Sequence, residues 1–164
     1  MTDTRSTPTS SSCARVVFIG AGPGEADLIT VRGARLLAQA KVVLFDALAD
    51  PTLRDLAPDA EWVDVGKRGF SGKPGSDFNG QTRINHLLVE HARAVGAQFG
   101  ADAIVARLKG GDPSLFGRLE EELSALRDAQ ISTEVVPGVT SALAAAAATQ
   151  RPLTRRGTGR SVSF

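Results

Sequence analysis

Apolar residues follow two patterns that alternate along the chain. Short apolar runs, bounded by glycine, proline or aspartate, are typical of buried β-strands. These runs cover residues 16–20, 42–45, 61–65, 103–108 and 133–136. The last residues, Ser161 to Phe164, predict the start of one more strand.

Segments between these runs carry apolar residues every three or four positions, which predicts helices that cover a sheet. Thr30 is the expected N-cap of the first helix, and Pro51 begins a shorter helical piece. Longer helices are expected at 81–97, 117–129 and 139–149. Strands that alternate with helices pair in parallel through right-handed crossovers. We therefore predict a three-layer α/β domain with a mostly parallel sheet.

The segments outside this pattern are polar or rich in glycine. Residues 1–14 are rich in serine and threonine, which predicts a disordered tail, and the glycines at 69–80 predict a mobile loop. Residues 15–154 are expected to form the domain. Residues 155–164 follow the domain, and the chain is expected to be cut short within them.

Composition narrows the class of protein. Hydrophobic residues make up 42% and charged residues 23% of the 164 residues, as in folded domains. A net charge of +1 argues against a protein that coats nucleic acid. Cys13 is the only cysteine, so no internal disulfide is expected. The chain has no apolar run that could cross a bilayer and no secretory signal in its first dozen residues, which favours a cytoplasmic protein.

Three glycine-containing loops follow predicted strands: Gly20–Gly24, Gly110–Asp112 and Pro137-Gly138. Ligands of open α/β sheets bind at the carboxyl ends of the strands, where these loops are expected to meet. One alternative is a nicotinamide dinucleotide site, with Asp46 about 20 residues beyond the glycine turn as the ribose acceptor. Glu25 stands where that pattern needs its third glycine, however, and Pro23 lacks an N–H for a pyrophosphate. Another alternative is a turn that only packs helix on sheet.

The order of motifs GAGPGEADLIT, VVLFDAL, VGKR, RLKGGDPSLFGR, VPGVTSA and RPLTRR resembles the uroporphyrinogen-III C-methyltransferases of the tetrapyrrole methylase superfamily. The resemblance runs from about Val16 to Phe164. It implies methyl transfer from S-adenosyl-L-methionine (SAM) to two ring carbons of uroporphyrinogen III, which gives precorrin-2 for sirohaem or cobalamin. It also implies a SAM cleft between two α/β domains and a homodimer. Residues 155–164 would then be the truncated start of the linker to a missing C-terminal domain.

The resemblance carries roles onto matching positions of this sequence. Asp46 takes the position of the proton acceptor, and Lys67 that of the proton donor. The implied SAM contacts are Pro23, Gly110, Gly111, Asp112, Leu115, Thr140 and Ser141. Because uroporphyrinogen carries many carboxylates, cations near the loop ends are candidate substrate contacts. These are Arg68, Lys109, Arg118, Arg155 and Arg156.

Several of these residues have a simpler structural interpretation. Asp46 can cap the turn that follows it, and Lys67 and Arg68 can form a solvated strand end. Glu120, Glu121 and Glu122 are expected to be solvated first-turn residues that favour the helix dipole. His86 and His91 lack the spacing of a helical zinc pair, so they are expected at the surface and no metal is expected. Trp62 is expected to pack rather than stack on a ligand.

The chain also departs from the family pattern. Leu119 and Glu120 stand where two glycines are usual, and Arg155 stands where a histidine is usual. Because half of the cleft is expected to be missing, we expect impaired turnover. The alternatives are a precorrin methylase, a methylase of ribosomal RNA or translation factors, and a non-catalytic binding or dimerisation fragment.

Overall fold

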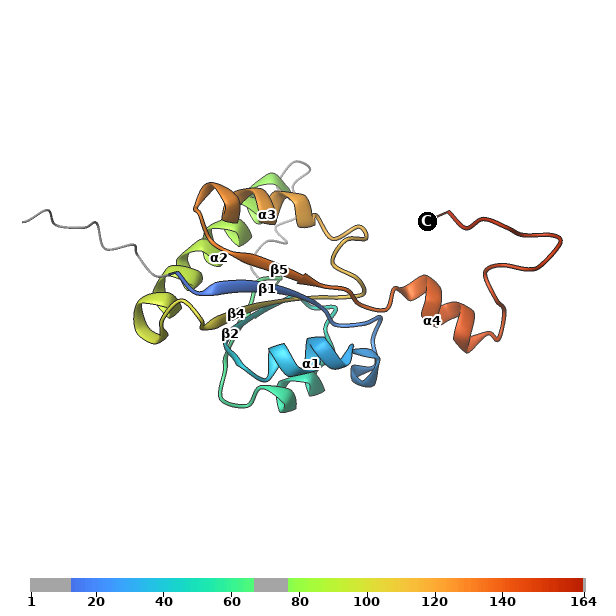
Figure 1. Ribbon diagram of the computed structural model, residues 1–164, viewed down its shortest axis with the longest axis horizontal. Helices are drawn as coiled ribbons and strands as arrows, with labels where there is room; N and C mark the ends of the chain where they lie inside the picture. Colours follow the sequence, from blue (N-terminus) through green and yellow to red (C-terminus); the bar gives the residue numbers. More distant parts are fainter. Residues whose placement is uncertain (1–12, 67–76, 164) are drawn as a thin grey trace, which may run out of the picture.

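A parallel β-sheet forms the centre of the computed structural model, which describes residues 13–66 and 77–163 (Figure 1). The strand order within these residues is β3-β2-β4-β1-β5, and every neighbouring pair is parallel. The strands are β1 (Arg15–Gly20), β2 (Ala40–Phe45), β3 (Glu61–Asp64), β4 (Ile104–Lys109) and β5 (Thr133–Val136). The predicted α/β fold and the predicted strands before residue 140 are confirmed.

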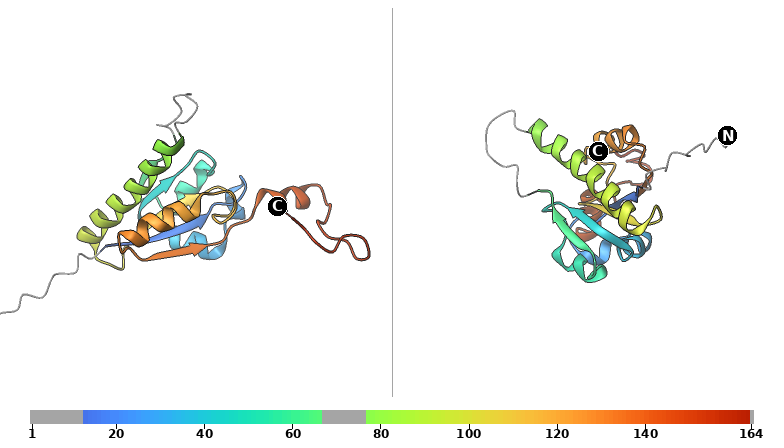
Figure 2. Two further views of the ribbon diagram at one scale, coloured as in Figure 1. Left: turned by 90° about the horizontal axis from the view of Figure 1, so that it is seen from above. Right: turned by 90° about the vertical axis from the view of Figure 1, so that its left-hand side faces the viewer.

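Helices cover both faces of the sheet (Figures 1 and 2). One face packs against α1 and η2, through Leu37 and Leu53, and the other against α2 and α3, through Leu88 and Leu126. The helices are η1 (Ala26–Leu28), α1 (Val31–Leu37), η2 (Pro51–Leu56), α2 (Asp77–Phe99), α3 (Leu119–Asp128) and α4 (Ser141–Ala148). Burial on both faces explains why β1 and β4 read as nearly continuous apolar runs.

The predicted N-cap of the first helix, Thr30, is found at the start of α1. The Thr30 hydroxyl accepts a hydrogen bond from the Gly33 N–H at 3.1 Å, as an N-cap should. Ordered structure begins before Val16, because Ala14 is buried and its N–H donates to the Ala92 carbonyl at 2.8 Å. Residues 1–12 of the predicted tail and 67–76 of the predicted loop lie outside the described residues.

The C-terminal segment projects away from the sheet (Figures 1 and 2). No residue of α4 is buried, and the Leu143 side chain is 49% exposed. The predicted strand at 161–164 is wrong for its described part, since residues 161–163 form no strand. Its segment extends past the sheet edge, where it has no neighbouring strand to pair with, and only a local bridge joins Arg155 and Gly159.

Backbone segments from three strands meet at the carboxyl end of the sheet without side chains between them. A Cβ on Gly20 would lie 2.5 Å from the Gly138 Cα and 2.8 Å from the Gly111 carbonyl oxygen. A Cβ on Gly138 would collide with that same Gly111 oxygen. The loops after β1, β4 and β5 can therefore lie this close only when Gly20 and Gly138 are glycines.

We expect Gly138→Ala to lower the free energy of unfolding by about 1–3 kcal/mol, because its Cβ must displace rigid backbone. Urea denaturation measures this change. Gly80→Ala is the matched control, since a Cβ at this position of α2 meets nothing within 4 Å. Alanine there should instead stabilise the helix by about 0.5–1 kcal/mol. Equal stabilities of the two variants would contradict the packing argument.

Candidate functional site

A pocket of about 480 Å³ lies at the carboxyl ends of the strands, within the usual size range of small-molecule sites. It is formed by the loops that follow β1, β2, β4 and β5 together with the start of α3. The predicted residues that line it are Pro23, Asp46, Lys109, Gly110, Gly111, Asp112, Leu115, Arg118, Thr140 and Ser141. Parallel strands explain this convergence, because their carboxyl ends share one edge of the sheet.

Two of the other predicted site residues are described by the structure and do not line this pocket. Arg155 and Arg156 are exposed on the projecting C-terminal segment. Lys67 and Arg68 lie outside the described residues.

Backbone hydrogen bonds join the two glycine loops that form one wall of the pocket. The Gly111 N–H donates to the Gly22 carbonyl at 2.7 Å, and the Gly22 N–H donates to the Gly111 carbonyl at 3.3 Å. Gly22 and Gly111 have φ values of +83° and +67°, which glycine adopts without strain. The wall therefore presents backbone and little side chain to the pocket.

Asp112 ties this wall to the loop after β5. One carboxylate oxygen accepts a hydrogen bond from the Ser114 N–H at 2.8 Å, and the other accepts one from the Gly138 N–H at 2.9 Å. Sequence reasoning expected this carboxylate to contact a ligand and did not anticipate that it bridges two loops. Each oxygen keeps a further lone pair with which it can accept a hydrogen bond from a ligand.

The segment from Leu115 to Arg118 lines the pocket in an unusual backbone conformation. Phe116 and Arg118 have φ values of +55° and +51°, and such values in non-glycine residues tend to occur at functional sites. Between them, a Cβ on Gly117 would lie 2.5 Å from the Pro113 carbonyl oxygen. The Phe116 side chain is 87% exposed, so this loop presents an aromatic ring to solvent at the pocket.

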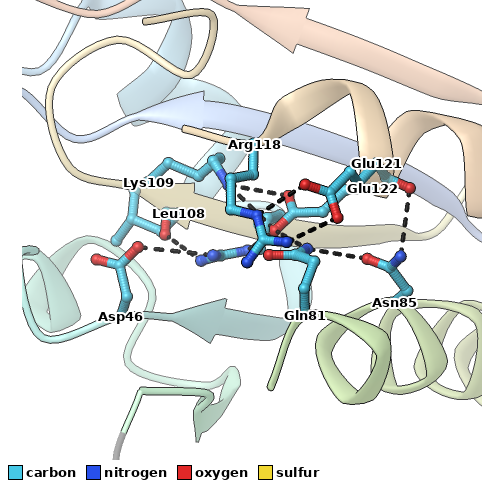
Figure 3. A network of polar contacts seen from close by, with 9 residues as sticks. Asp46, Gln81, Asn85, Leu108, Lys109, Arg118, Glu121 and Glu122 are labelled. Carbon is cyan, nitrogen blue, oxygen red and sulfur yellow. Dashed lines mark hydrogen bonds and ion pairs between the residues drawn. The ribbon is translucent and has the colours of Figure 1, made fainter. Parts of the chain in front are cut away.

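Three charged side chains that line the pocket are buried: Arg107, Lys109 and Glu122. Figure 3 shows the polar contacts around Lys109 and Glu122. The Lys109 ammonium donates to both oxygens of Glu122, at 3.1 and 3.0 Å, and the Arg107 Nε donates to Glu122 at 3.4 Å. Burial is the main cause that lowers the pKa of Lys109, and the neighbouring Arg107 charge lowers it further, whereas Glu122 opposes the shift. Lys109 is only 4% exposed, so its charge is directed to Glu122 rather than to the open pocket.

The expectation that Glu122 is solvated is wrong. Glu122 lies three residues after Leu119 and four before Leu126, so the helical repeat places it on the face of α3 that packs against the sheet. Its burial is tolerated because two cations neutralise it. Arg107, which sequence reasoning also missed, lies two residues before Lys109 in β4 and therefore faces α3 with it.

Asp46 follows β2 and contacts the charged cluster. One carboxylate oxygen accepts a hydrogen bond from the Leu48 N–H at 3.2 Å, so Asp46 does cap its turn. The other oxygen lies 3.6 Å from Arg107 Nη2. The side chain is 26% exposed at the pocket, and this accessibility leaves room for a role besides capping.

Thr140 contributes an unsatisfied polar atom to the opposite side of the pocket. Its hydroxyl is buried, has no hydrogen-bond partner within the described residues, and does not cap α4. An unpaired buried hydroxyl costs free energy, which a ligand that bonds to it could offset.

Other features have structural explanations. Trp62 packs edge-on against Phe45 at 5.6 Å between ring centroids, and its indole N–H donates to the Ala57 carbonyl, as its packing role predicted. His86 is exposed, and His91 is half-buried rather than fully at the surface. Within residues 13–66 and 77–163, no cluster of His, Cys, Asp and Glu could hold a metal ion, and no helix is long and apolar enough to cross a membrane.

We expect Asp112→Asn to lower the free energy of unfolding by about 1–3 kcal/mol, since an amide NH₂ must face a backbone N–H donor. Thermal and urea denaturation measure the loss. Asp102→Asn is the control, because Asp102 is exposed in the turn before β4. A similar loss in both variants would contradict the bridging role of Asp112.

Comparison with known proteins identifies the family of the chain. The family of Tetrapyrrole (Corrin/Porphyrin) Methylases matches residues 15–163. The chain is 42% identical over 151 residues to a uroporphyrinogen-III C-methyltransferase of Cyanidium caldarium, covering 92% of this chain and 55% of that protein. It is 45% identical over 150 residues to a siroheme synthase of Tolumonas auensis, covering 91% of this chain and 30% of that protein. The chain thus spans about half or less of the length of these relatives.

A solved structure gives the same result. Uroporphyrin-III C-methyl transferase from Thermus thermophilus, complexed with S-adenyl homocysteine, is 44% identical and has a TM-score of 0.67, covering 88% of this chain and 51% of that chain. The family match extends from β1 through the C-terminal segment, and so includes every loop that lines the pocket. The chain belongs to the tetrapyrrole methylase family.

Proposed function

We propose that this chain acts in SAM-dependent C-methylation of uroporphyrinogen III, which gives precorrin-2. The observation that carries the proposal is a pocket in which two glycine loops, the Asp46 carboxylate and a buried hydroxyl without a partner among the described residues meet. The names of the similar proteins support the choice of substrate. The siroheme synthase relative favours the sirohaem pathway for the product.

In this proposal SAM lies against the backbone wall of the pocket. Pro23, Gly110, Gly111 and Leu115 supply close backbone approach and apolar contact. Thr140 and Ser141 supply hydroxyls, and SAM would give the Thr140 oxygen the partner that it lacks among the described residues. Asp112 holds the two loops at the right separation and can accept one more hydrogen bond from the ligand. SAM supplies an electrophilic methyl group, so the protein mainly has to position the two reactants.

Asp46 is proposed as the proton acceptor. Its carboxylate borders the pocket, where it can take the proton that the macrocycle loses after methylation. Lys67 is proposed as the proton donor on the strength of the resemblance alone. Metal ions have no proposed part in these steps.

The carboxylates of the substrate need cations, and arginine suits them because it can donate two parallel hydrogen bonds. Arg118 is the candidate that lines the pocket, where it also binds Glu121 at 2.7 and 2.9 Å. Arg68, Arg155 and Arg156 are proposed as further contacts. Lys109 is proposed to act through Glu122 instead of touching the substrate.

The resemblance suggests the wider arrangement. Residues 15–154 are proposed to form one half of a SAM cleft, with residues 155–164 leading toward a second α/β domain that forms the other half. A cytoplasmic homodimer that binds neither nucleic acid nor membrane is the proposed assembly. A precorrin substrate is the alternative, and methyl transfer to precorrins assayed beside uroporphyrinogen III separates the two.

We expect Thr140→Val to weaken binding of S-adenosylhomocysteine about five- to tenfold, which is the effect of one lost hydrogen bond. Isothermal titration calorimetry measures the dissociation constant. Thr149→Val is the matched control, because the Thr149 hydroxyl bonds within α4 and lies outside the pocket. Undetectable binding by the unchanged protein would contradict the SAM site.

We expect Asp46→Asn to lower methyl transfer about 10²- to 10⁴-fold, the usual effect of losing a general base. Transfer of labelled methyl from SAM to uroporphyrinogen III gives the rate. Binding of S-adenosylhomocysteine should stay within about twofold of the original, since Asp46 is not among the proposed SAM contacts. Unchanged methyl transfer would refute the role of Asp46.

A further inference from the structure

Glu122 is a fully buried carboxylate located next to the candidate base. It is 0% exposed, and three side chains donate to it: Lys109, Arg107 and Gln81. Burying such a group is costly, and well-packed apolar residues often serve stability as well or better. The presence of this cluster at the pocket, rather than in the centre of the core, suggests a role beyond stability.

The Arg107 guanidinium lies between two carboxylates. Its Nε is 3.4 Å from Glu122 Oε1, and its Nη2 is 3.6 Å from Asp46 Oδ2. Both distances exceed the 2.7–2.9 Å range of strong charge-assisted hydrogen bonds, so Arg107 is fully committed to neither partner. A short bond of 2.8 Å from Nη1 to the Leu108 carbonyl holds the guanidinium in this intermediate place.

Lys109 decides how strongly Glu122 attracts Arg107. Its ammonium contacts both Glu122 oxygens and neutralises much of their charge. The cluster as a whole balances two cations, Arg107 and Lys109, against two anions, Glu122 and Asp46. Removing Glu122 or Lys109 therefore changes the balance of forces on the Arg107 guanidinium, which lies between Glu122 and Asp46.

We propose that Glu122 is a positioning residue for Asp46, because it competes with Asp46 for the Arg107 guanidinium, and that Lys109 sets the strength of this competition. Glu122 thereby tunes the proton affinity of Asp46. The inference rests on the proposed function only in treating Asp46 as the base.

Other charged groups also surround Asp46, on elements that border the two pockets to which it belongs. Those on η2, β3, α2 and the loops near Asp46 are exposed or half-buried, so solvent and salt screen them more than they screen the buried cluster. These groups are Asp50, Arg54, Glu61, Asp64, Arg83, Asp112 and Arg118. The buried cluster is therefore expected to dominate the differences between variants.

Carbon-13 NMR titration of the Asp46 carboxyl in the full chain tests the proposal. The measurement needs neither SAM nor substrate, so it remains valid if the proposed methyl transfer fails. Glu122→Gln should lower the pKa of Asp46 by about half a pH unit or more, because Arg107 loses its competing anion. Lys109→Met should raise that pKa by a similar amount, because the unneutralised Glu122 draws Arg107 away.

Opposite shifts of the Asp46 pKa in the two variants distinguish the proposed effect of Glu122 and Lys109 from a general loss of structure. A loss of structure would shift this pKa in the same direction in both variants. Glu120→Gln is the matched control, since Glu120 is an exposed glutamate in the first turn of the same helix. It should leave the Asp46 titration unchanged. Unchanged titration in Glu122→Gln and Lys109→Met, or shifts of the same sign, would overturn the proposal.

A double variant keeps the test decisive if a single variant does not fold. Combining Lys109→Met with Glu122→Gln removes both charges of the buried Lys109–Glu122 ion pair. Neither partner of that pair is then left as an unpaired buried charge. Arg107 then faces Asp46 without its buried competitor, so the pKa of Asp46 should fall below that of the original protein. An unchanged value in the double variant would show that Glu122 does not compete for Arg107.

Discussion

The contact of bare backbone at Gly20, Gly111 and Gly138 is the constraint on which the pocket depends. Loops that follow three different strands can approach this closely only because no side chain separates them. The Asp112 carboxylate then bridges the second loop to the third, and paired backbone bonds join the first to the second. The result is a wall of fixed amides and carbonyls, whose polar groups need no side-chain rearrangement to meet a ligand.

The side of the pocket opposite this backbone wall is formed by charged side chains instead. There, charged side chains from β4, α3 and the loop after β2 contact one another, and Leu119, Leu123 and Leu126 pack α3 against the sheet. This arrangement suits the proposed site, which must bind SAM through its backbone wall and accept a proton from the second reactant through a charged side chain. It also places the charges where the dielectric constant is low and small displacements matter.

Most of the fold could be predicted because strands buried on both faces are unmistakable in sequence. Local patterns were less informative about charged residues in buried elements. Glu122 follows two other glutamates and reads as solvated, although its helical phase with Leu119 and Leu126 indicated burial. Arg107 and Lys109 end an apolar strand, where sequence alone does not tell a loop-end cation from a buried one. Their environment depends on α3, which packs against β4 only in the folded chain.

Prediction from the sequence was limited for a different reason in the C-terminal segment. Among the described residues, 161–163 have no adjacent strand, and strand formation requires a hydrogen-bonding partner as well as a suitable pattern. The helix α4 does not depend on a neighbour in this way, since its hydrogen bonds are internal and it forms from helix-favouring alanines although it buries none of them. Thr140, where this segment begins, belongs to the pocket, so the site extends to the boundary of the packed core.

The position of Trp62 makes the protein a natural optical reporter. The chain has one tryptophan and no tyrosine, so its near-ultraviolet emission comes from a single indole. That indole contacts Phe45, the residue immediately before Asp46, and lies 5.5 Å from the Arg54 guanidinium. Changes in its fluorescence therefore come from one defined place, the carboxyl end of β2 and its neighbour β3, without any label being attached.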